Sequence, residues 1–502
     1  MQEQNNAYDQ VSYASRAFPQ THPDRLATLA ILFGLQPPPI AQCRVLELGC
    51  GDGSNLLPMA YALPDSRFVG IDLAATPIAR GQALSAALRL ENIALHAMDV
   101  LDIGADFGLF DYIIAHGLYS WVPASVQSKI LALCQQHLAP QGVAYISYNT
   151  YPGGHLRDLV RAMMRFHVQH VDDQTQQVSE ARALLEFVAN AQGEADVYGN
   201  VLKAELKRIA DNDASFVFHD DLAAINEPLY FHEFVARAAA HDLQFLAEAD
   251  YFEMQDSAFS PTVAETLRHV AGGERILQEQ YADFLKGRRF RQTLLCHRAH
   301  TLVAAADLAP FAVASSVTPA ASTDVASATA AVEFRNARGL AMTTNHPLLK
   351  AAMQTLAQTW PRAVPFAELL ASAHQQSRIS VSLTQASTLL SEMLLKVYGR
   401  NLLSLHAHTP QFAVQCGARP RASALARLQS IERSMVTNLR HENVELTGPL
   451  ARKLLPLLDG TRTRKNLRDD LARGLGVQSK SLAAELEPKL SELAKLALIE
   501  VV

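Results

Sequence analysis

The stretch Val45-Leu46-Glu47-Leu48-Gly49-Cys50-Gly51-Asp52-Gly53-Ser54 decides the fold of this chain. Residues 44–47 approach it as a strand, three glycines follow at alternate positions, and an apolar helix is expected from residue 55. Glycine has no Cβ, so the backbone can turn sharply there and come close to a ligand. The amides at the start of the following helix then face whatever binds at the turn. The pattern predicts a site for a nucleotide-sized ligand.

The sequence around this turn alternates short apolar strands with helices. We expect helices at 55–62, 76–90 and 125–138, and strands at 44–47, 67–72, 94–98, 110–115 and 142–148. Such alternation is typical of βαβ units, so the predicted fold class is α/β with a Rossmann-like parallel sheet. Residues 155–215 have helical spacing without a strand signal and predict a helical insertion. Strands at 243–248 and 291–297 are expected to complete the sheet.

The remainder of the chain is predicted to form smaller α+β modules. Residues 301–332 are rich in Ala, Ser, Thr and Val with little charge, which is typical of a linker. Beyond them, the order helix, helix, helix, short strand is typical of a winged helix and occurs twice, without a shared sequence period. We therefore expect a first domain at 1–300, a linker at 301–332, a middle helical or winged-helix-like domain at 333–415 and a C-terminal winged-helix-like domain at 416–502.

The composition is that of a globular protein with several domains. The 502 residues exceed one ordinary core, and 49% of them are hydrophobic. A net charge of −6 argues against nucleic-acid binding across the surface, although a basic cluster at 462–468 would permit a local DNA contact. Five cysteines without paired spacing predict neither a disulfide framework nor a metal site. Because we find no export signal and no apolar run near the ~20 residues of a membrane span, we expect a cytoplasmic protein without membrane insertion.

The glycine turn departs from the fingerprint of dinucleotide-binding enzymes. That fingerprint has glycine or alanine three positions after its second glycine, where this chain has Ser54. An acid, Glu47, lies two positions before the first glycine, where dinucleotide turns usually carry an apolar residue. S-adenosylmethionine (AdoMet) has an α-amino and a carboxylate group in place of a pyrophosphate. An acid next to open glycine amides therefore favours AdoMet.

Two further acids end the next two predicted strands. Asp72 lies ~20 residues after the turn, at the distance that recognition of ribose hydroxyls requires. Asp99 can accept a hydrogen bond from the adenine amine, with Met98 against the ring. A lone glycine turn is weak evidence, and a lone Asp at a strand end is usually a helix cap. The ordered set of acids and glycines is much harder to obtain by accident, and it predicts AdoMet as the cofactor.

Segments on both sides of the turn carry a family resemblance. They are Tyr8-Asp9, Tyr13-Ala14-Ser15, Phe18-Pro19-Gln20-Thr21-His22-Pro23, Ala115-His116-Gly117-Leu118-Tyr119-Ser120-Trp121-Val122-Pro123 and Ser147-Tyr148-Asn149-Thr150-Tyr151-Pro152-Gly153. With residues 47–53, which look like motif I of class I AdoMet-dependent methyltransferases, they resemble bacterial methyltransferases with a methyltransferase regulatory domain. The best-understood members are protein-lysine methyltransferases that act on outer-membrane proteins. The resemblance is dense over 8–165, continues through 226–234 and thins after residue 300.

The resemblance implies roles for individual residues. An N-terminal segment with Tyr8, Tyr13 and His22 would fold over the cofactor as a lid. Gly154 departs from the pattern, because some members carry tryptophan there; if that ring helps to form a substrate channel, the acceptor of this chain differs. The implied cofactor-binding residues are Tyr13, Glu47, Gly49, Gly51, Asn55, Asp72, Leu73, Met98, Asp99, Val100 and His116. The implied acceptor pocket contains His116, Tyr119, Trp121, Asn149 and Tyr151, with Tyr148 beside them.

Each pocket residue also has a purely structural interpretation. Trp121 would simply pack against the following helix, His116 would be a loop histidine, Tyr148 would lie inside the sheet, and Asn149 would shape a turn. The functional interpretation suits methyl transfer to lysine, in which positioning and exclusion of water matter more than a strong base. A lysine acceptor must first lose its proton, and an apolar pocket lowers its pKa.

The sequence thus predicts an AdoMet-dependent methyltransferase, and the family resemblance implies protein lysine side chains as its acceptors. Outer-membrane proteins before export are the expected acceptors, and the C-terminal modules would recognise the protein substrate. Two alternatives remain open. One is a small-molecule methyltransferase that forms a homodimer through its C-terminal half. The other is a non-catalytic protein that binds AdoMet as a regulatory ligand.

Overall fold

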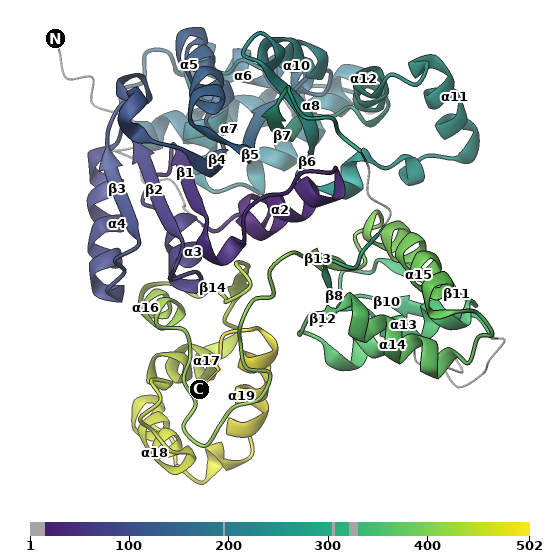
Figure 1. The fold of residues 1–502 in the computed structure, drawn as a ribbon. Coiled ribbons are helices and arrows are strands. Elements are labelled where there is room, and N and C mark those ends of the chain that lie inside the picture. Colours follow the sequence, from purple (N-terminus) through teal and green to yellow (C-terminus); the bar gives the residue numbers. More distant parts are fainter. Residues whose placement is uncertain (1–15, 194–195, 304–306, 321–329, 502) are drawn as a thin grey trace.

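The structure is a computed structural model that describes residues 16–193, 196–303, 307–320 and 330–501. Figure 1 shows a large α/β part formed by the described residues from 16 to about 300, a second part in green and a third in yellow. The second and third parts lie on the same side of the first, each below a different end of it.

A seven-stranded sheet of order β3-β2-β1-β4-β5-β7-β6 forms the centre of the first part. The first five strands pair in parallel, and β7 lies antiparallel between β5 and β6. This confirms the predicted α/β class, with β5 beginning four residues earlier than the sequence predicts. The strands are β1 (Arg44–Leu48), β2 (Arg67–Asp72), β3 (Ile93–Ala97), β4 (Phe110–Ala115), β5 (Leu138–Asn149), β6 (Leu243–Glu248) and β7 (Phe290–His297).

Helices cover both faces of this sheet, because successive residues of each strand point to opposite faces. Val45 of β1 packs in a core cluster with α2 and α3, whereas its neighbour Leu46 packs in a second cluster with α5 and α10. The helices of this part are α2 (Pro23–Leu32), α3 (Leu56–Ala62), α4 (Ala75–Leu88), α5 (Ala124–His137), α10 (Phe231–Ala239), α11 (Pro261–Ala271) and α12 (Arg275–Lys286).

The segment after β5 is helical, as its spacing predicts. Its helices have a small core of their own, which includes Val160, Leu185 and Leu202. A π-helical turn, Val217–Asp221, ends the segment and carries Asp220 and Asp221 towards arginines of α6 and α8. The helices are α6 (Gly154–Val168), α7 (Gln174–Asn190), α8 (Val197–Ala210) and the short α9 (Ala214–Phe216).

The second part begins inside the stretch 301–332 that the sequence predicts to be a linker. That stretch contributes β8 (Ala312–Ala314), which lies between β12 (Val364–Pro365) and β13 (Ser404–His406) in a three-stranded sheet. A three-residue strand of small side chains has little local signal, because its partners lie about 50 and 90 residues further along the chain. The other elements are β9 (Thr318–Pro319), β10 (Val332–Arg335), β11 (Ala341–Thr344), α13 (Pro347–Thr359), α14 (Phe366–Ser377) and α15 (Leu383–Tyr398).

The third part packs the helices α16, α17, α18 and α19 and a short hairpin around a separate leucine-rich core. The turn between β14 and β15 of this hairpin reaches back to the first part. Among the described residues, no helix has the length and apolar character needed to cross a membrane. The elements are α16 (Ala424–Glu432), β14 (Met435–Thr437), β15 (Asn443–Glu445), α17 (Gly448–Leu454), α18 (Arg464–Leu475) and α19 (Leu486–Lys495).

A buried arginine joins the last two strands of the large sheet to α12. Arg291 of β7 is almost fully buried, and its guanidinium contacts Glu248 Oε1 at 2.7 Å and Asp283 Oδ2 at 2.8 Å. Glu279 Oε2 lies 3.0 Å away, and the guanidinium carbon is 3.8 Å from the centroid of the Phe231 ring. These acids raise the pKa of Arg291 further, so the guanidinium stays charged.

We expect the substitution Arg291→Leu to reduce the free energy of unfolding by about 3–5 kcal/mol, because it leaves buried carboxylates without their counter-charge. The control is Arg335→Leu, which removes an exposed ion pair with Glu333 on β10. That substitution should cost about 0–1 kcal/mol. Urea unfolding followed by circular dichroism measures both, and equal losses for the two variants would contradict the assigned role of the buried cluster.

Candidate active site

The carboxyl ends of the parallel strands open onto a cavity of about 960 Å³. Ligands of open α/β sheets bind at this edge. Every described residue of the predicted cofactor set lines the cavity. These residues are Glu47, Gly49, Gly51, Asn55, Asp72, Leu73, Met98, Asp99, Val100 and His116, whereas Tyr13 and Tyr8 lie outside the described residues.

The glycine turn after β1 is pinned to the end of β2. Gly49, Gly51 and Gly53 have φ values of 73°, 57° and 73°, in the left-handed region that favours glycine. The amides of residues 49 and 50 both donate to the carbonyl oxygen of Ile71, at 2.8 and 3.0 Å. The amide of Gly51 donates to Asp72 Oδ2 at 2.8 Å. The amide of Ala74 donates to Asp72 Oδ1 at 2.9 Å, which fixes the carboxylate in place. Each carboxylate oxygen can accept more than one hydrogen bond, so Asp72 is suited to bind ribose hydroxyls as well.

Glu47 is a buried acid with an oxygen that lacks a hydrogen-bond donor. Its side chain is 3% exposed, and Oε1 accepts a hydrogen bond from Asn55 Nδ2 at 2.8 Å. Oε2 makes no hydrogen bond to any described residue. Burial, with the charges of Asp72 and Asp52, raises the pKa of Glu47 to about 8. An unpaired buried carboxylate oxygen next to open amides fits the α-ammonium group of AdoMet.

The segment after β3 forms one end of the cavity. The Asp99 carboxylate accepts a hydrogen bond from the amide of Leu101 at 2.9 Å, so it caps the short turn Val100–Asp102. Asp99 is therefore a cap and also lines the cavity, and its contact with adenine stays a prediction. The half-buried Met98 packs on the core cluster under the sheet and also lines the cavity.

His116 follows β4 and presents a neutral ring to the cavity. Its Nδ1 lies 2.8 Å from the Tyr145 hydroxyl, which itself donates to Gln292 Oε1 at 2.8 Å. Nδ1 must therefore carry the proton, and Nε2 is a hydrogen-bond acceptor. Burial and the nearby Arg16 lower the pKa of His116 to about 4. The ring of Phe18 packs against it at 3.9 Å between centroids.

Trp121 and Asn149 line the cavity, as the sequence analysis expects. The guanidinium carbons of Arg157 and Arg161 lie 5.5 and 5.7 Å from the centroid of the Trp121 ring, within cation–π range. Asn149 Nδ2 donates to Asn226 Oδ1 at 2.6 Å, so its amide is tied to the segment before α10.

Tyr119 and Tyr151 are not brought to the cavity wall. Tyr119 is fully buried, and its ring lies 5.4 Å from that of Phe234 on α10. Tyr148 stacks on the same phenylalanine at 4.1 Å, inside the core. Tyr151 stacks on His155 at 3.9 Å and donates to Asp158 at 3.0 Å. Packing on Phe234 of α10 holds Tyr119 and Tyr148 in the core, and the stacking and hydrogen bond with α6 hold Tyr151.

Several cavity residues were not assigned from the sequence, although some lie in segments quoted for the family resemblance. Gly154 is among the lining residues, and a Cβ there would come within 3.2 Å of the Tyr151 ring. His22 caps α2 by accepting a hydrogen bond from the Asp24 amide and is not part of the cavity wall. The unassigned lining residues include Arg16, Phe18, Gln20, Arg157, Arg208, Phe216, Asp220, Asn226, Arg289 and Phe290.

The described part of the chain contains no group of three or more His, Cys, Asp or Glu side chains that could hold a metal ion.

Three segments match known sequence families. Residues 45–142 match the family described as "Methyltransferase domain", and residues 213–297 match "Predicted methyltransferase regulatory domain". Residues 418–498 match "PKMT, C-terminal winged helix domain". The methyltransferase match, together with a structural relative solved with AdoHcy, identifies AdoMet as the cofactor, which confirms the prediction.

Related proteins cover nearly the whole chain. A protein of Rickettsia prowazekii described as uncharacterized is 32% identical over 473 residues, which are 92% of this chain and 84% of the relative. A second uncharacterized protein of that organism is 38% identical over 241 residues, covering 48% of this chain and 96% of its own. The solved structure of PKMT2 from Rickettsia typhi matches with a TM-score of 0.86 at 26% identity, covering 97% of this chain and 99% of that one. PKMT2 has also been solved in complex with AdoHcy, with the same coverage and score.

We expect AdoHcy to bind more tightly as the pH rises from 6 to 8. Its ammonium group pairs with ionised Glu47, and below a pKa of about 8 this carboxyl must first release a proton. Each pH unit below that pKa should weaken binding by up to about tenfold. Calorimetry over this pH range measures the effect. In Glu47→Gln the affinity should be weak and nearly independent of pH; an affinity of the unaltered protein that does not change over this range would contradict the assignment.

Proposed function

Because this chain belongs to the family of AdoMet-dependent methyltransferases that carry a methyltransferase regulatory domain, we propose that it methylates lysine side chains of a protein substrate. AdoMet supplies the methyl group and leaves as AdoHcy. The observation that carries the proposal is the acceptor side of the cavity, where aromatic rings and a neutral histidine meet next to the cofactor residues.

The charges of the cavity favour an amine that has lost its proton. Four arginines line the acceptor side, namely Arg16, Arg157, Arg208 and Arg289. Three of them are paired with acids, because Arg157 contacts Asp220 and Asp221, Arg208 contacts Glu205 and Asp221, and Arg289 contacts Glu205. Burial next to Arg16 lowers the pKa of a lysine ammonium, as both already do for His116.

His116 is suited to orient the neutral amine. Its Nε2 accepts a hydrogen bond from one N–H of the lysine, which leaves the nitrogen lone pair for the transferred methyl group. The product then carries a positive charge until it releases a proton to solvent. Trp121, Phe18 and Phe290 supply aromatic faces, which attract a methylated ammonium. Asn149, fixed by Asn226, is positioned for a second polar contact.

Two further observations support a protein acceptor over a small molecule. Residues 418–498 match the C-terminal winged-helix domain of PKMT proteins, and the whole chain matches PKMT2. Gly154 adds no side chain to the cavity wall, so this wall leaves room for a long acceptor side chain. We propose outer-membrane proteins as the acceptors, methylated before their export.

The direct test is incubation with methyl-labelled AdoMet and unfolded cell-envelope proteins, followed by mass spectrometry of the peptides. We expect methylated lysine residues in protein bands. Label that appears solely in small extractable products would contradict a protein acceptor. Absence of label from both fractions would contradict methyltransferase activity.

The substitution Trp121→Ala separates the acceptor side from the cofactor side. We expect it to lower the rate of protein methylation at least tenfold while the Kd for AdoHcy changes less than twofold, because Trp121 faces the acceptor. Asp72→Ala is the matched variant on the cofactor side and should weaken AdoHcy binding. An unchanged methylation rate in Trp121→Ala would contradict its place in the acceptor pocket.

A further inference from the structure

The turn between β14 and β15 of the C-terminal part contacts the cofactor site. His441 lies in this turn, is 4% exposed, and places Nε2 3.0 Å from Asn55 Oδ1. Asn55 is the residue that donates to Glu47 Oε1, and it lines the cavity itself. His441 and Asn55, which are 386 positions apart in the chain, are therefore in direct contact. They meet next to Glu47, the acid assigned to the cofactor's ammonium group.

The direction of each hydrogen bond in this chain of contacts follows from the chemistry of Asn55. Its amide nitrogen has two hydrogens, and these point to Thr21 Oγ1 at 2.9 Å and to Glu47 Oε1 at 2.8 Å. Its carbonyl oxygen accepts from the amide of Phe18 at 2.9 Å. His441 Nε2 must therefore donate to the same oxygen. Burial lowers the pKa of His441 well below its ordinary value, so the ring is neutral, with its one proton on Nε2.

The turn also holds the segment that covers the cofactor site. Asn443 Nδ2 donates to the carbonyl oxygen of Ala17 at 2.7 Å, and Asn443 Oδ1 accepts from the Ala17 amide at 3.3 Å. The next residue, Phe18, packs on His116 in the cavity. The turn thus supports the acid Glu47 through Asn55 and the aromatic lid residue Phe18 through Ala17.

The turn is itself rigidly held. Asn438 Oδ1 accepts hydrogen bonds from the amides of Arg440 and Glu442, both at 2.9 Å, and this closes the turn. His441 has a φ of 59°, a left-handed conformation that the turn imposes. The Arg440 guanidinium lies 4.2 Å from the centroid of the Trp360 ring in the second part.

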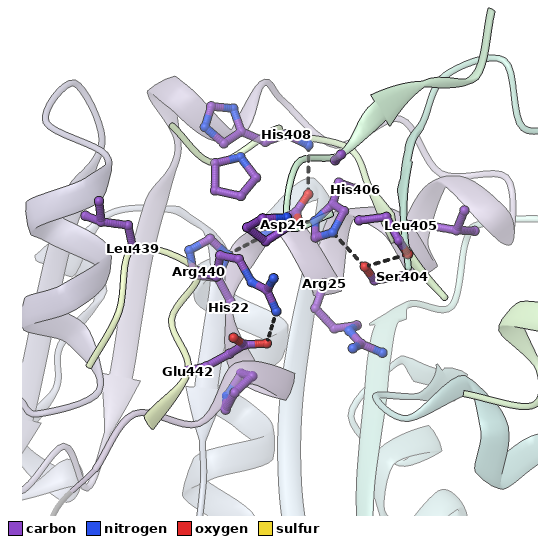
Figure 2. A pocket seen from close by; sticks show the side chains of 15 residues that line it. His22, Asp24, Arg25, Ser404, Leu405, His406, His408, Leu439, Arg440 and Glu442 are labelled. Atoms are coloured by element: carbon purple, nitrogen blue, oxygen red, sulfur yellow. Dashed lines mark hydrogen bonds and ion pairs between the residues drawn. The ribbon is translucent and has the colours of Figure 1, made fainter. Parts of the chain in front are cut away.

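All three parts of the chain meet at this turn. Figure 2 shows Leu439, Arg440 and Glu442 from the third part beside His22 and Asp24 of the first, with His406 of β13 in the second part and His408 just after it. Asp24 Oδ2 lies 2.7 Å from His406 Nδ1, and Asp24 Oδ1 accepts from the amide of His408 at 2.7 Å. These two contacts fix the end of the second part at the start of α2, beside the turn of the third part.

We propose that His441 is a positioning residue for the cofactor, which makes the C-terminal winged-helix domain a structural part of the AdoMet site. Through Asn55 it holds the Glu47 carboxylate in place, and the turn around it holds the lid segment 16–22. This role concerns cofactor binding and does not depend on the identity of the acceptor. Because coupling between two sites is reciprocal, a bound cofactor must also tighten the docking of the turn.

The first test compares AdoHcy affinities of full-length variants by calorimetry. We expect His441→Leu to raise the Kd at least fivefold, and His441→Gln, whose amide can still donate to Asn55, to recover most of the affinity. The control is Tyr61→Phe, which removes the hydrogen bond from the Ala424 amide and the contact with Glu500 at the other end of α3. It loosens the same interface without touching Asn55 and should leave the Kd unchanged.

Two outcomes of this comparison overturn the proposal. An unchanged Kd in His441→Leu means that Asn55 is positioned without the histidine. An equal rise in Tyr61→Phe means that the general docking of the domain, and not His441, sets the affinity.

The second test uses the unaltered protein and therefore does not depend on the folding of a variant. We expect saturating AdoHcy to slow amide hydrogen exchange in residues 438–443 at least fivefold, while exchange in α18 of the same domain stays constant. Unchanged exchange in the turn would overturn the proposal, because the reciprocal coupling would then be missing.

Discussion

The hydrogen bond between Asn55 and the buried Glu47 carboxylate is the contact around which the site is organised. Without this partner, both oxygens of the Glu47 carboxylate would be buried at the end of β1 without a hydrogen bond, which would cost free energy of folding. The side-chain oxygen of Asn55 also accepts hydrogen bonds from the Phe18 amide and from His441. Its side-chain nitrogen also donates to Thr21. One side chain thus joins the first strand, the lid segment and the C-terminal part.

The sheet supplies the remaining geometry. Parallel strands bring their carboxyl ends to one edge, so residues that follow β1, β2, β3 and β4 meet around a single cavity. The backbone of the glycine turn holds Asp72, and His116 is held by Tyr145 on the neighbouring strand. In the proposed function, the cofactor residues and the acceptor residues occupy adjacent walls of this cavity, which would bring the reacting nitrogen close to the transferred methyl group.

The cofactor side could be predicted from the sequence because its signal is local. Glu47, Asp72 and Asp99 each lie at or within two residues of the end of a strand, and the strand–helix alternation fixes where strands end. The acceptor side was predicted less completely, since the choice between cavity and core for an aromatic ring depends on distant helices. Trp121 faces the cavity, whereas Tyr119, two residues earlier, packs against Phe234 of α10. No local pattern distinguishes these two rings.

Contacts between distant parts of the chain were beyond sequence reasoning. His441 and Asn55 have no feature in common that would pair them, and β8 gains its place from two strands much further along the chain. Only the assembled fold shows that the C-terminal part touches the cofactor site. The division into predicted modules is for the same reason an incomplete guide to function, because a residue of one module contacts a cavity residue of another.

The most direct test of this account is a crystal structure of the full chain with AdoHcy. The account predicts the ammonium group within hydrogen-bond distance of Glu47 Oε2, the ribose hydroxyls on Asp72, and the sulfur facing the side of the cavity with His116 and Trp121. A ligand whose ammonium lies away from Glu47, or whose sulfur faces away from His116 and Trp121, would contradict it.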